Sequence, residues 1–164
     1  EGYDFPIIRY AEVLLNYAEA MYELGTTGKA LDDALNISLN LVRLRVNPDM
    51  PKLTTSFASE NSLNMREEIR RERTIELYNE GFRVDDLKRW NTAIVEMPKP
   101  ILGVKWTGTD FATSWAGASN MAKDSDGCLI LENSRRWGSK NDLYPLPVDQ
   151  CQLNPNLGQN PGWQ

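Results

Sequence analysis

The chain has 164 residues, the length of one ordinary domain, and a domain of this size buries roughly 70% of the surface of its unfolded chain. Its 18 basic and 23 acidic residues give a net charge of −5, which argues against a nucleic-acid partner because such a partner requires a basic face. Histidine is absent, which excludes histidine-based catalytic triads and removes the commonest metal ligand. We therefore expect neither a cofactor nor a metal site.

No apolar run approaches the ~20 residues that a membrane-spanning helix needs, and no signal segment opens the chain. The chain begins with Glu1 in what reads as the middle of a protein. We therefore expect a longer parent protein, with any targeting segment upstream. The two cysteines, Cys128 and Cys151, fit one bridge or two free thiols, and the sequence leaves both open.

The first 45 residues read as a helical hairpin. A helix is predicted over PIIRYAEVLLNYAEAMYELG, with Asp4 as a cap, Pro6 in the first turn and Gly25 at its end. After a GTTG turn, KALDDALNISLNLVRLR is predicted to form one second helix.

Small residues are placed along this hairpin in the order typical of a tetratricopeptide unit: Ala18, Gly25, Ala30 and Ala34. One such unit cannot bury its own faces, so it needs neighbouring helices. Because no second copy is present in the sequence, we expect those neighbours upstream.

A connector and two further helices are predicted next. Residues 46–60 are rich in Pro, Asp, Ser and Thr, which indicates a connector. A third helix is expected from about Leu63 to Glu80, capped by Asn61 or Ser62 and ended by Gly81. A short helix, VDDLKRW, follows it.

The third helix and the short helix carry charged and apolar residues on every face. Burying an unpaired charge costs several kcal/mol, so we expect the carboxylates to be paired with arginines, whose planar fork holds a carboxylate by two bonds. The predicted structural charge network comprises Glu72, Arg73, Glu76, Glu80, Arg83, Asp86 and Arg89.

The same carboxylates admit a catalytic alternative. Two carboxyl groups about 5 to 10 Å apart can hydrolyse a glycoside, and Glu72 with Glu76, or Glu80 with Asp86, are candidates for such a pair. A general acid needs a raised pKa, whereas arginines beside a carboxylate lower its pKa. We therefore predict that the chain is not an enzyme and has no catalytic residues, with a glycoside hydrolase as the least favoured alternative.

Residues 98–142 are predicted to be an irregular loop region with short strands at GVKW and CLILE. Loops on a rigid scaffold are where binding residues collect, and flat aromatic faces suit the C–H faces of a sugar ring. The candidate glycan-binding residues are Trp106, Phe111, Trp115 and Trp137. The alternative for each ring is that it packs inward and forms a small core for the loop.

Two smaller features complete the sequence. The DSDG segment from Asp124 to Gly127 is read as a turn, because Asn133 stands where a calcium loop needs its closing Glu. The last segment, YPLP followed by NPNLGQNPGW, is predicted to take an extended path. Trp163 is expected to anchor this tail on the helical body.

Four ordered blocks, which span residues 4–163, resemble the carboxy-terminal part of the SusD/RagB family of Bacteroidetes outer-membrane nutrient-binding lipoproteins. They are DFPIIRYAEVLLNYAEA, NLVRLR, IRRERTIELYNEGFRVDDLKRW and YPLPVDQCQLNPNLGQNPGW. The interval 98–142 carries no motif that matches the family.

The resemblance implies a mainly α fold of tetratricopeptide-like helical hairpins, with a long irregular loop region that carries short strands and an extended C-terminal tail. It implies that residues 1–164 form one SusD/RagB-like C-terminal domain, without the family's N-terminal helices and lipid anchor.

The resemblance also implies a function. We expect a non-enzymatic, surface-exposed lipoprotein of the outer membrane that captures oligosaccharides and delivers them to a SusC-like TonB-dependent transporter. Its contact with the membrane would be made only through the upstream lipid anchor. Contact of Trp163 with the transporter is then the alternative to its anchoring role. The alternative from another class is a tetratricopeptide-type protein-interaction module. The sequence does not identify the glycan, and it leaves open whether this part of the protein retains the ligand site.

Overall fold

The computed structural model describes residues 7–163. It divides into two compact units, residues 1–83 and 84–164. The expected single domain over residues 1–164 stays a prediction. The capping roles expected for Asp4 and Pro6 lie outside the described residues.

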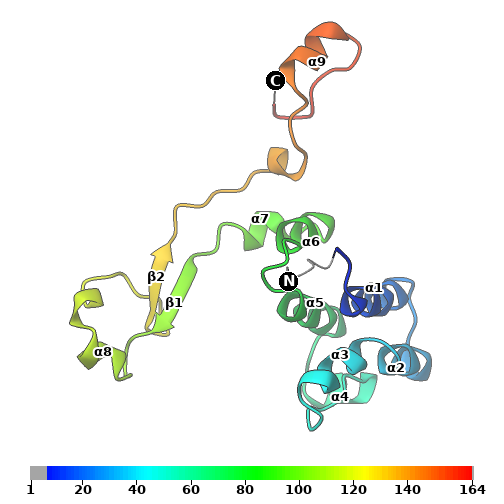
Figure 1. Ribbon diagram of the computed structural model, residues 1–164, viewed down its shortest axis with the longest axis vertical. Coiled ribbons are helices and arrows are strands. Elements are labelled where there is room, and N and C mark those ends of the chain that lie inside the picture. The colour runs from blue at the N-terminus through cyan, green and yellow to red at the C-terminus, as the bar shows by residue number, and fades with distance from the viewer. Residues whose placement is uncertain (1–6, 164) are drawn as a thin grey trace, which may run out of the picture. The chain divides into compact units, whose positions relative to one another are not determined.

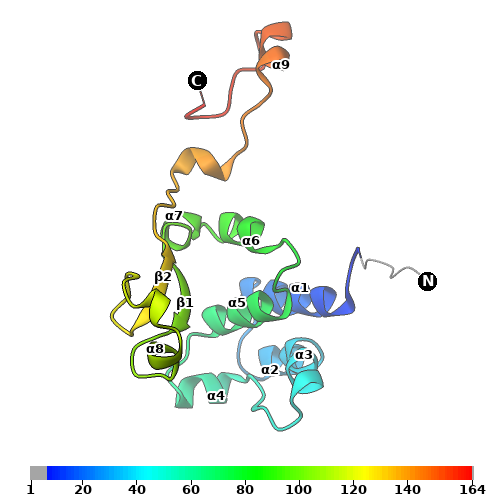
Figure 2. The same cartoon turned by 60° about the vertical axis from the view of Figure 1, so that its left-hand side comes forward.

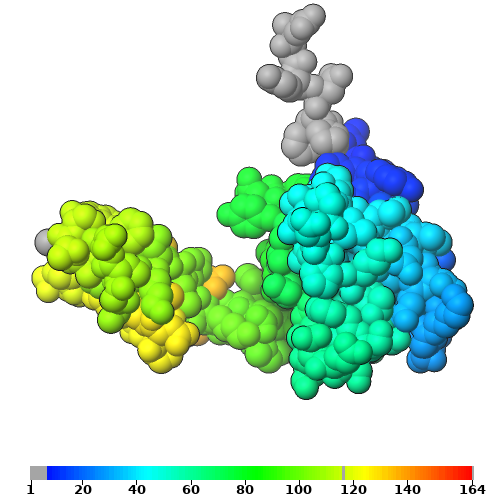
Figure 3. Space-filling model, turned by 90° about the horizontal axis from the view of Figure 1, so that it is seen from below, coloured from blue at the N-terminus to red at the C-terminus, as the bar shows by residue number. Residues whose placement is uncertain are grey.

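The first unit is helical: α1 Tyr10–Glu23, α2 Gly28–Asn36, α3 Leu39–Val46, α4 Thr55–Glu60 and α5 Met65–Glu76. Helix α1 packs against α2, α3 and α5, and Figures 1 and 2 both place α5 beside α1. Fully buried aliphatic side chains fill the space between these helices: Leu15, Leu35, Leu39, Leu53 and Ile69. Figure 3 shows the side chains of this unit, coloured blue to green, packed into one continuous body. The tetratricopeptide-like hairpin expected from the sequence is present, and Gly25 ends α1 in the left-handed region with φ +82°.

The second helix of the hairpin is broken at Ser38, where a single helix over residues 29–45 was predicted. Ser38 leaves the helical region, with φ −137° and ψ −100°, and its buried hydroxyl donates to the Ala34 carbonyl at 2.6 Å. Side-chain bonding to the carbonyl four residues earlier competes with the helix backbone and bends helices. After the break, the buried Asn40 side chain donates to the Leu53 carbonyl at 2.9 Å and accepts from the Leu53 N–H at 2.8 Å.

The predicted connector 46–60 contains a helix of its own, α4. The Thr54 hydroxyl caps it by accepting from the Phe57 N–H at 3.1 Å, and the Asp32 carboxylate accepts from the Thr55 N–H at 2.7 Å. These side-chain hydrogen bonds satisfy main-chain N–H groups in the first turn of α4. The polar composition of the segment had predicted a connector without a helix.

Helix α5 is shorter than the predicted third helix, and its cap is Asn64 rather than Asn61 or Ser62. The Asn64 side-chain oxygen Oδ1 accepts from the Glu67 N–H at 3.3 Å. The helix ends at Glu76 instead of Glu80, because Asn79 and Gly81 take left-handed conformations with φ +62° and +87°. Glu80 therefore lies in a turn.

The second unit is less regular. Its elements are α6 Arg83–Arg89, which begins at the last residue of the first unit, α7 Ala93–Glu96, β1 Ile101–Lys105, α8 Phe111–Ser114, the 3₁₀ turns η1 Ala116–Ala118 and η2 Ser139–Asp142, β2 Cys128–Glu132 and α9 Val148–Leu153. Strands β1 and β2 pair antiparallel, with Ile101 opposite Glu132 and Lys105 opposite Cys128. The two predicted strands and the mainly α fold class are thus confirmed.

The turn predicted at residues 124–127 is also present. The Asp124 carboxylate accepts from the N–H groups of Asp126 and Cys128 at 3.0 and 2.8 Å, and Gly127 has φ +80°. Cys128 and Cys151 are both free thiols.

The C-terminal tail folds against the segment just before it. The Gln159 amide bonds both the N–H and the carbonyl of Leu146, at 2.7 and 2.8 Å. The Trp163 indole N–H donates to the carbonyls of Lys140 and Leu143 at 2.8 and 3.0 Å. Trp163 thus anchors the tail on residues 140–143 of its own unit, and the anchor expected on the helical body stays a prediction. The indole N–H of Trp163 therefore has two main-chain acceptors within the same unit.

No helix within residues 7–163 is both long enough and apolar enough to span a membrane.

Candidate functional site

The carboxylates of α5 and the turn after it are held by arginines from other helices. Arg9, at the start of α1, donates to the Glu80 carboxylate at 2.9 and 2.6 Å and to the Glu76 carboxylate at 2.9 Å. The hydrogen bonds to Glu80 have the larger effect and those to Glu76 the smaller, and both raise the pKa of the Arg9 guanidinium. Arg45 of α3 donates to the same Glu76 carboxylate at 3.0 and 2.9 Å. Glu76 therefore ties three segments together, and the predicted network contained neither Arg9 nor Arg45.

Glu72 lies against a buried arginine. Its carboxylate oxygen is 3.4 Å from Nε of Arg43 on α3. Burial raises the pKa of the Glu72 carboxyl above its ordinary value, while the charges of Arg43 and Arg71 act in the opposite direction. The expectation that neighbouring arginines lower the pKa of these acids was wrong for Glu72. The loss of hydration on burial outweighs the attraction between its carboxylate and the charges of Arg43 and Arg71.

The remaining members of the predicted network lie as follows. Arg73 is only 4% exposed, donates to the Asn16 side chain at 2.7 Å and has its guanidinium carbon 5.5 Å from the Phe82 ring centroid. Arg83 donates to the Thr74 hydroxyl at 2.8 Å.

In the second unit the buried Asp86 carboxylate accepts from Nε of Arg89 at 2.8 Å. In both units, therefore, these acids lie beside guanidinium groups. Glu72 and Glu76 also line a pocket of about 200 Å³, which they share with Arg43 and Arg71.

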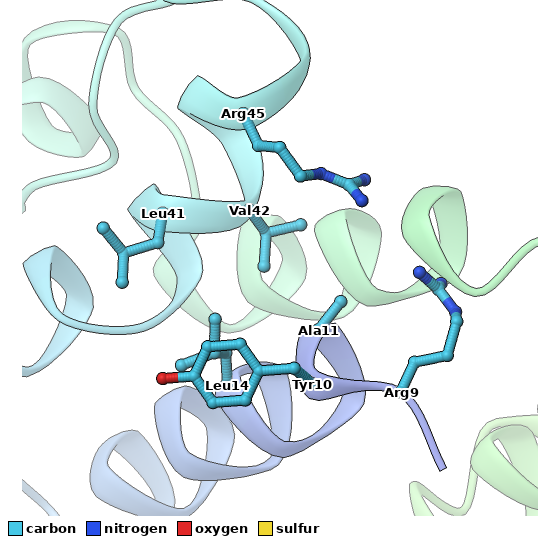
Figure 4. Close-up of a pocket in the computed structure, with 7 residues that line it drawn as sticks. All are labelled: Arg9, Tyr10, Ala11, Leu14, Leu41, Val42 and Arg45. Atoms are coloured by element: carbon cyan, nitrogen blue, oxygen red, sulfur yellow. The ribbon is translucent and has the colours of Figure 1, made fainter. Parts of the chain in front are cut away.

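A pocket of about 360 Å³ lies between α1 and α3 (Figure 4). Its lining residues are Arg9, Tyr10, Ala11, Leu14, Leu41, Val42 and Arg45. In Figure 4 the Tyr10 ring lies next to Leu14, Leu41 and Val42 face them from α3, and the two arginines stand at one edge. The walls are aliphatic, and the Arg9 donors are occupied by Glu76 and Glu80. The pocket suits an apolar group better than a polyhydroxylated one.

The structure separates the four aromatic residues that the sequence singled out. Trp106 is 5% exposed and packs with Ala118 and Leu129 in a small core. Phe111 and Trp115 are 50% and 55% exposed. They lie at the two ends of the single turn of α8, which is closed by the bond from the Trp115 N–H to the Phe111 carbonyl at 3.0 Å.

Trp106 packs against one ring of this exposed pair, that of Trp115. The ring centroids of Trp106 and Trp115 are 6.1 Å apart with an angle of 57° between the planes, a favourable tilted contact. Residues 111–115 therefore present two large apolar rings to solvent on a loop that has its own core. Sequence alone could not assign the inward ring, because the loop lacks a helical or strand period.

Trp137 is half-buried and oriented by Asp142, whose carboxylate accepts the Trp137 indole N–H at 3.0 Å. The Lys88 ammonium of α6 lies 5.8 Å from the Trp137 ring centroid and 3.9 Å from the Tyr144 ring centroid. Tyr144 is 73% exposed. Sequence reasoning missed Lys88 and Tyr144 as neighbours of Trp137, since 49 and 7 residues separate them along the chain.

Within the described part of the chain, no three Cys, Asp or Glu side chains converge in a way that could hold a metal ion.

Comparisons with known proteins place this chain in a family. Residues 1–163 match the model of the SusD family. One similar solved structure is a SusD-like carbohydrate binding protein from Bacteroides fragilis, with 31% identity and a TM-score of 0.69 over 93% of this chain and 28% of that one. A second is a SusD-like protein from the same species, with 29% identity and a TM-score of 0.64 over 96% of this chain and 25% of that one. This chain therefore spans about a quarter of the length of those structures. A search of curated proteins gave no match.

Proposed function

The chain belongs to the SusD family, and on that basis we propose that it is part of a cell-surface protein that captures oligosaccharides, with the exposed rings of Phe111 and Trp115 as contact surfaces. Trp137 offers a further ring, and Trp106 takes the supporting role because it is buried.

The observation that carries the proposal is the exposure of two large rings on a loop whose third ring is buried. Burying an aromatic side chain such as Phe gains about 1.5–3 kcal/mol, so two half-exposed rings beside an existing core forgo stability. A ligand with apolar C–H faces would recover this surface, and sugars have such faces. One similar structure, at 31% identity, is described as a carbohydrate binding protein, which agrees with this assignment.

The test is calorimetric titration of the protein with a panel of oligosaccharides, together with Phe111→Ala and Trp115→Ala. Each substitution is expected to weaken binding about 5- to 15-fold, the equivalent of about 1–1.5 kcal/mol for one stacked ring. Tyr78→Ala is the matched control, because Tyr78 is an exposed aromatic residue on the helical unit. Wild-type affinity in both ring variants, or an equal loss in the control, would contradict the proposal.

We further propose, from family membership, that the protein is an outer-membrane lipoprotein that delivers its oligosaccharide to a SusC-like TonB-dependent transporter without hydrolysing it. Purification from outer membranes under mild detergent should bring down such a transporter, identified by mass spectrometry. Recovery of the protein with no transporter would contradict the delivery step, and release of shortened sugars during titration would support the hydrolase alternative.

One observation favours the second candidate, a helical protein-interaction module. The apolar pocket between α1 and α3 is bordered by Tyr10 and Leu41, both exposed. Titration separates the candidates, because a protein-interaction module would bind none of the oligosaccharides and would release no product.

A further inference from the structure

The Lys88 side chain of the second unit contacts two aromatic rings, and it has no acidic partner among the described residues. The Lys88 ammonium lies 3.9 Å from the Tyr144 ring centroid and 5.8 Å from that of Trp137. Within residues 7–163, no carboxylate oxygen lies within ion-pair distance of this ammonium. The nearby Asp86 carboxylate is instead bonded to Nε of Arg89 at 2.8 Å.

The absence of an ion pair at Lys88 contrasts with the first unit. There, arginines on several helices lie within 4.0 Å of a carboxylate: Arg9, Arg43, Arg45, Arg66, Arg70 and Arg71. The chain has 23 acidic and 18 basic residues, so carboxylates are in surplus. Lys88 nevertheless contacts two aromatic rings rather than a carboxylate among the described residues.

The segment next to Trp137 adds to the positive charge. Residues 135–144 contain three basic residues and one acidic residue. Arg136 donates to the main-chain carbonyls of Asn133 and Arg135, and the Lys140 ammonium lies 4.7 Å from the Trp163 ring centroid. The one acidic residue, Asp142, accepts the Trp137 indole N–H. Residues 135–144 thus carry a net charge of +2 in a chain whose net charge is −5, and Lys88 contacts two rings of this segment.

The rings of Trp137 and Tyr144 provide apolar surfaces that a sugar ring can contact. Trp137 is held in place by its bond to Asp142, while Tyr144 is 73% exposed and keeps much of its ring open to solvent. The Lys88 ammonium has three donors, and its contact with an exposed ring is worth only about 0.5–1 kcal/mol. A charge-assisted hydrogen bond to an anion is stronger, so an anionic ligand can draw the ammonium away from the ring.

We propose that Lys88, Trp137 and Tyr144 form a subsite for an acidic sugar, one that carries a carboxylate or sulfate group on its ring. The aromatic faces contact the sugar C–H groups, and Lys88 binds the anionic group. This inference rests on the proposed glycan-binding function and names the class of glycan. It makes Lys88 the residue that selects acidic over neutral sugars.

The test is titration of the protein with three hexasaccharide probes: hexagalacturonate, a chondroitin sulfate hexasaccharide and a neutral galactose hexamer. The protein is expected to bind at least one acidic probe more tightly than the neutral one, with an affinity that falls as salt is added. Lys88→Met, which keeps the length of the side chain but removes the charge, should weaken binding of that acidic probe by about tenfold. It should leave binding of the neutral hexamer unchanged.

Two further variants make the result specific. Lys88→Arg keeps the charge and should retain the preference for the acidic probe. Lys140→Met removes a positive charge that lies on the Trp163 ring and should have little effect. Binding of hexagalacturonate, whose only anionic groups are carboxylates, shows that a carboxylate is sufficient, whereas the chondroitin sulfate probe carries both carboxylates and sulfates.

The inference is overturned if Lys88→Met binds the acidic probes like the wild type, or if Lys140→Met loses as much affinity. Tight binding of the neutral hexamer with no binding of either acidic probe would also overturn it, and would leave the proposed glycan-binding function intact. Failure of the wild-type protein to bind any oligosaccharide would overturn both.

Discussion

Replacement of Arg73 by alanine tests whether the charges of α5 hold the helical unit together. Arg73 is 4% exposed, donates to Asn16 at 2.7 Å and lies against the Phe82 ring. The substitution removes all of these contacts from a packed interior. We expect it to destabilise the fold rather than only weaken ligand binding.

The size of the loss follows from those contacts. A hydrogen bond from a charged donor is worth about 1.5–3 kcal/mol, and a partly desolvated cation–π contact about 1 kcal/mol. The buried methylene stem of the arginine adds to the loss. The result is about 4 kcal/mol, within the range of about 3–5 kcal/mol for breaking a buried charge interaction. In a chain of this length, that lowers the melting temperature by about 8–16 °C.

The assay is thermal unfolding followed by circular dichroism, with Arg71→Ala as the control. Arg71 is on the same helix, but its side chain is 60% exposed, and its ion-pair partner Glu68 lies only three residues before it on that helix. Such a pair contributes about 0.5 kcal/mol or less. Equal melting temperatures for Arg73→Ala and Arg71→Ala would refute the reasoning.

Two further predictions concern the same helical unit. Burial raises the pKa of Glu72, so the folded state binds this proton more tightly than the unfolded chain, and the stability gained is lost as pH rises through the raised pKa. As pH rises above the ordinary pKa of glutamate, about 4.3, the unfolding free energy of the wild type should therefore fall relative to that of Glu72→Gln; parallel curves for the two proteins would contradict this. Asn40→Ala leaves the buried N–H and carbonyl of Leu53 without their partners and should cost about 3 kcal/mol in urea unfolding, and a loss below about 1 kcal/mol would show that these bonds contribute little.

Local signals in the sequence were sufficient for the elements with a clear period and a clear end. The hairpin, its Gly25 stop and the two short strands follow from apolar spacing and turn residues. The break at Ser38 could not be predicted, because the apolar spacing continues across it and a serine that bonds to a carbonyl four residues earlier looks like any helical serine.

The candidate sites depended on contacts between residues far apart in the chain. Mixed charged and apolar faces on α5 indicated that its acids need partners, but Arg9 and Glu76 are 67 residues apart, and only the fold brings them together. The aromatic residues of the loop look alike in sequence, and packing alone sets Trp106 inside and Trp115 outside. The contact of Lys88 with Tyr144 likewise depends on tertiary structure.

The most direct measurement is a crystal structure of the protein with a bound oligosaccharide from the titration panel. We predict that a sugar ring lies against the exposed faces of Phe111 and Trp115, with Trp106 still buried beneath them. A sugar seated only in the pocket between α1 and α3, with both rings left in water, would contradict the account.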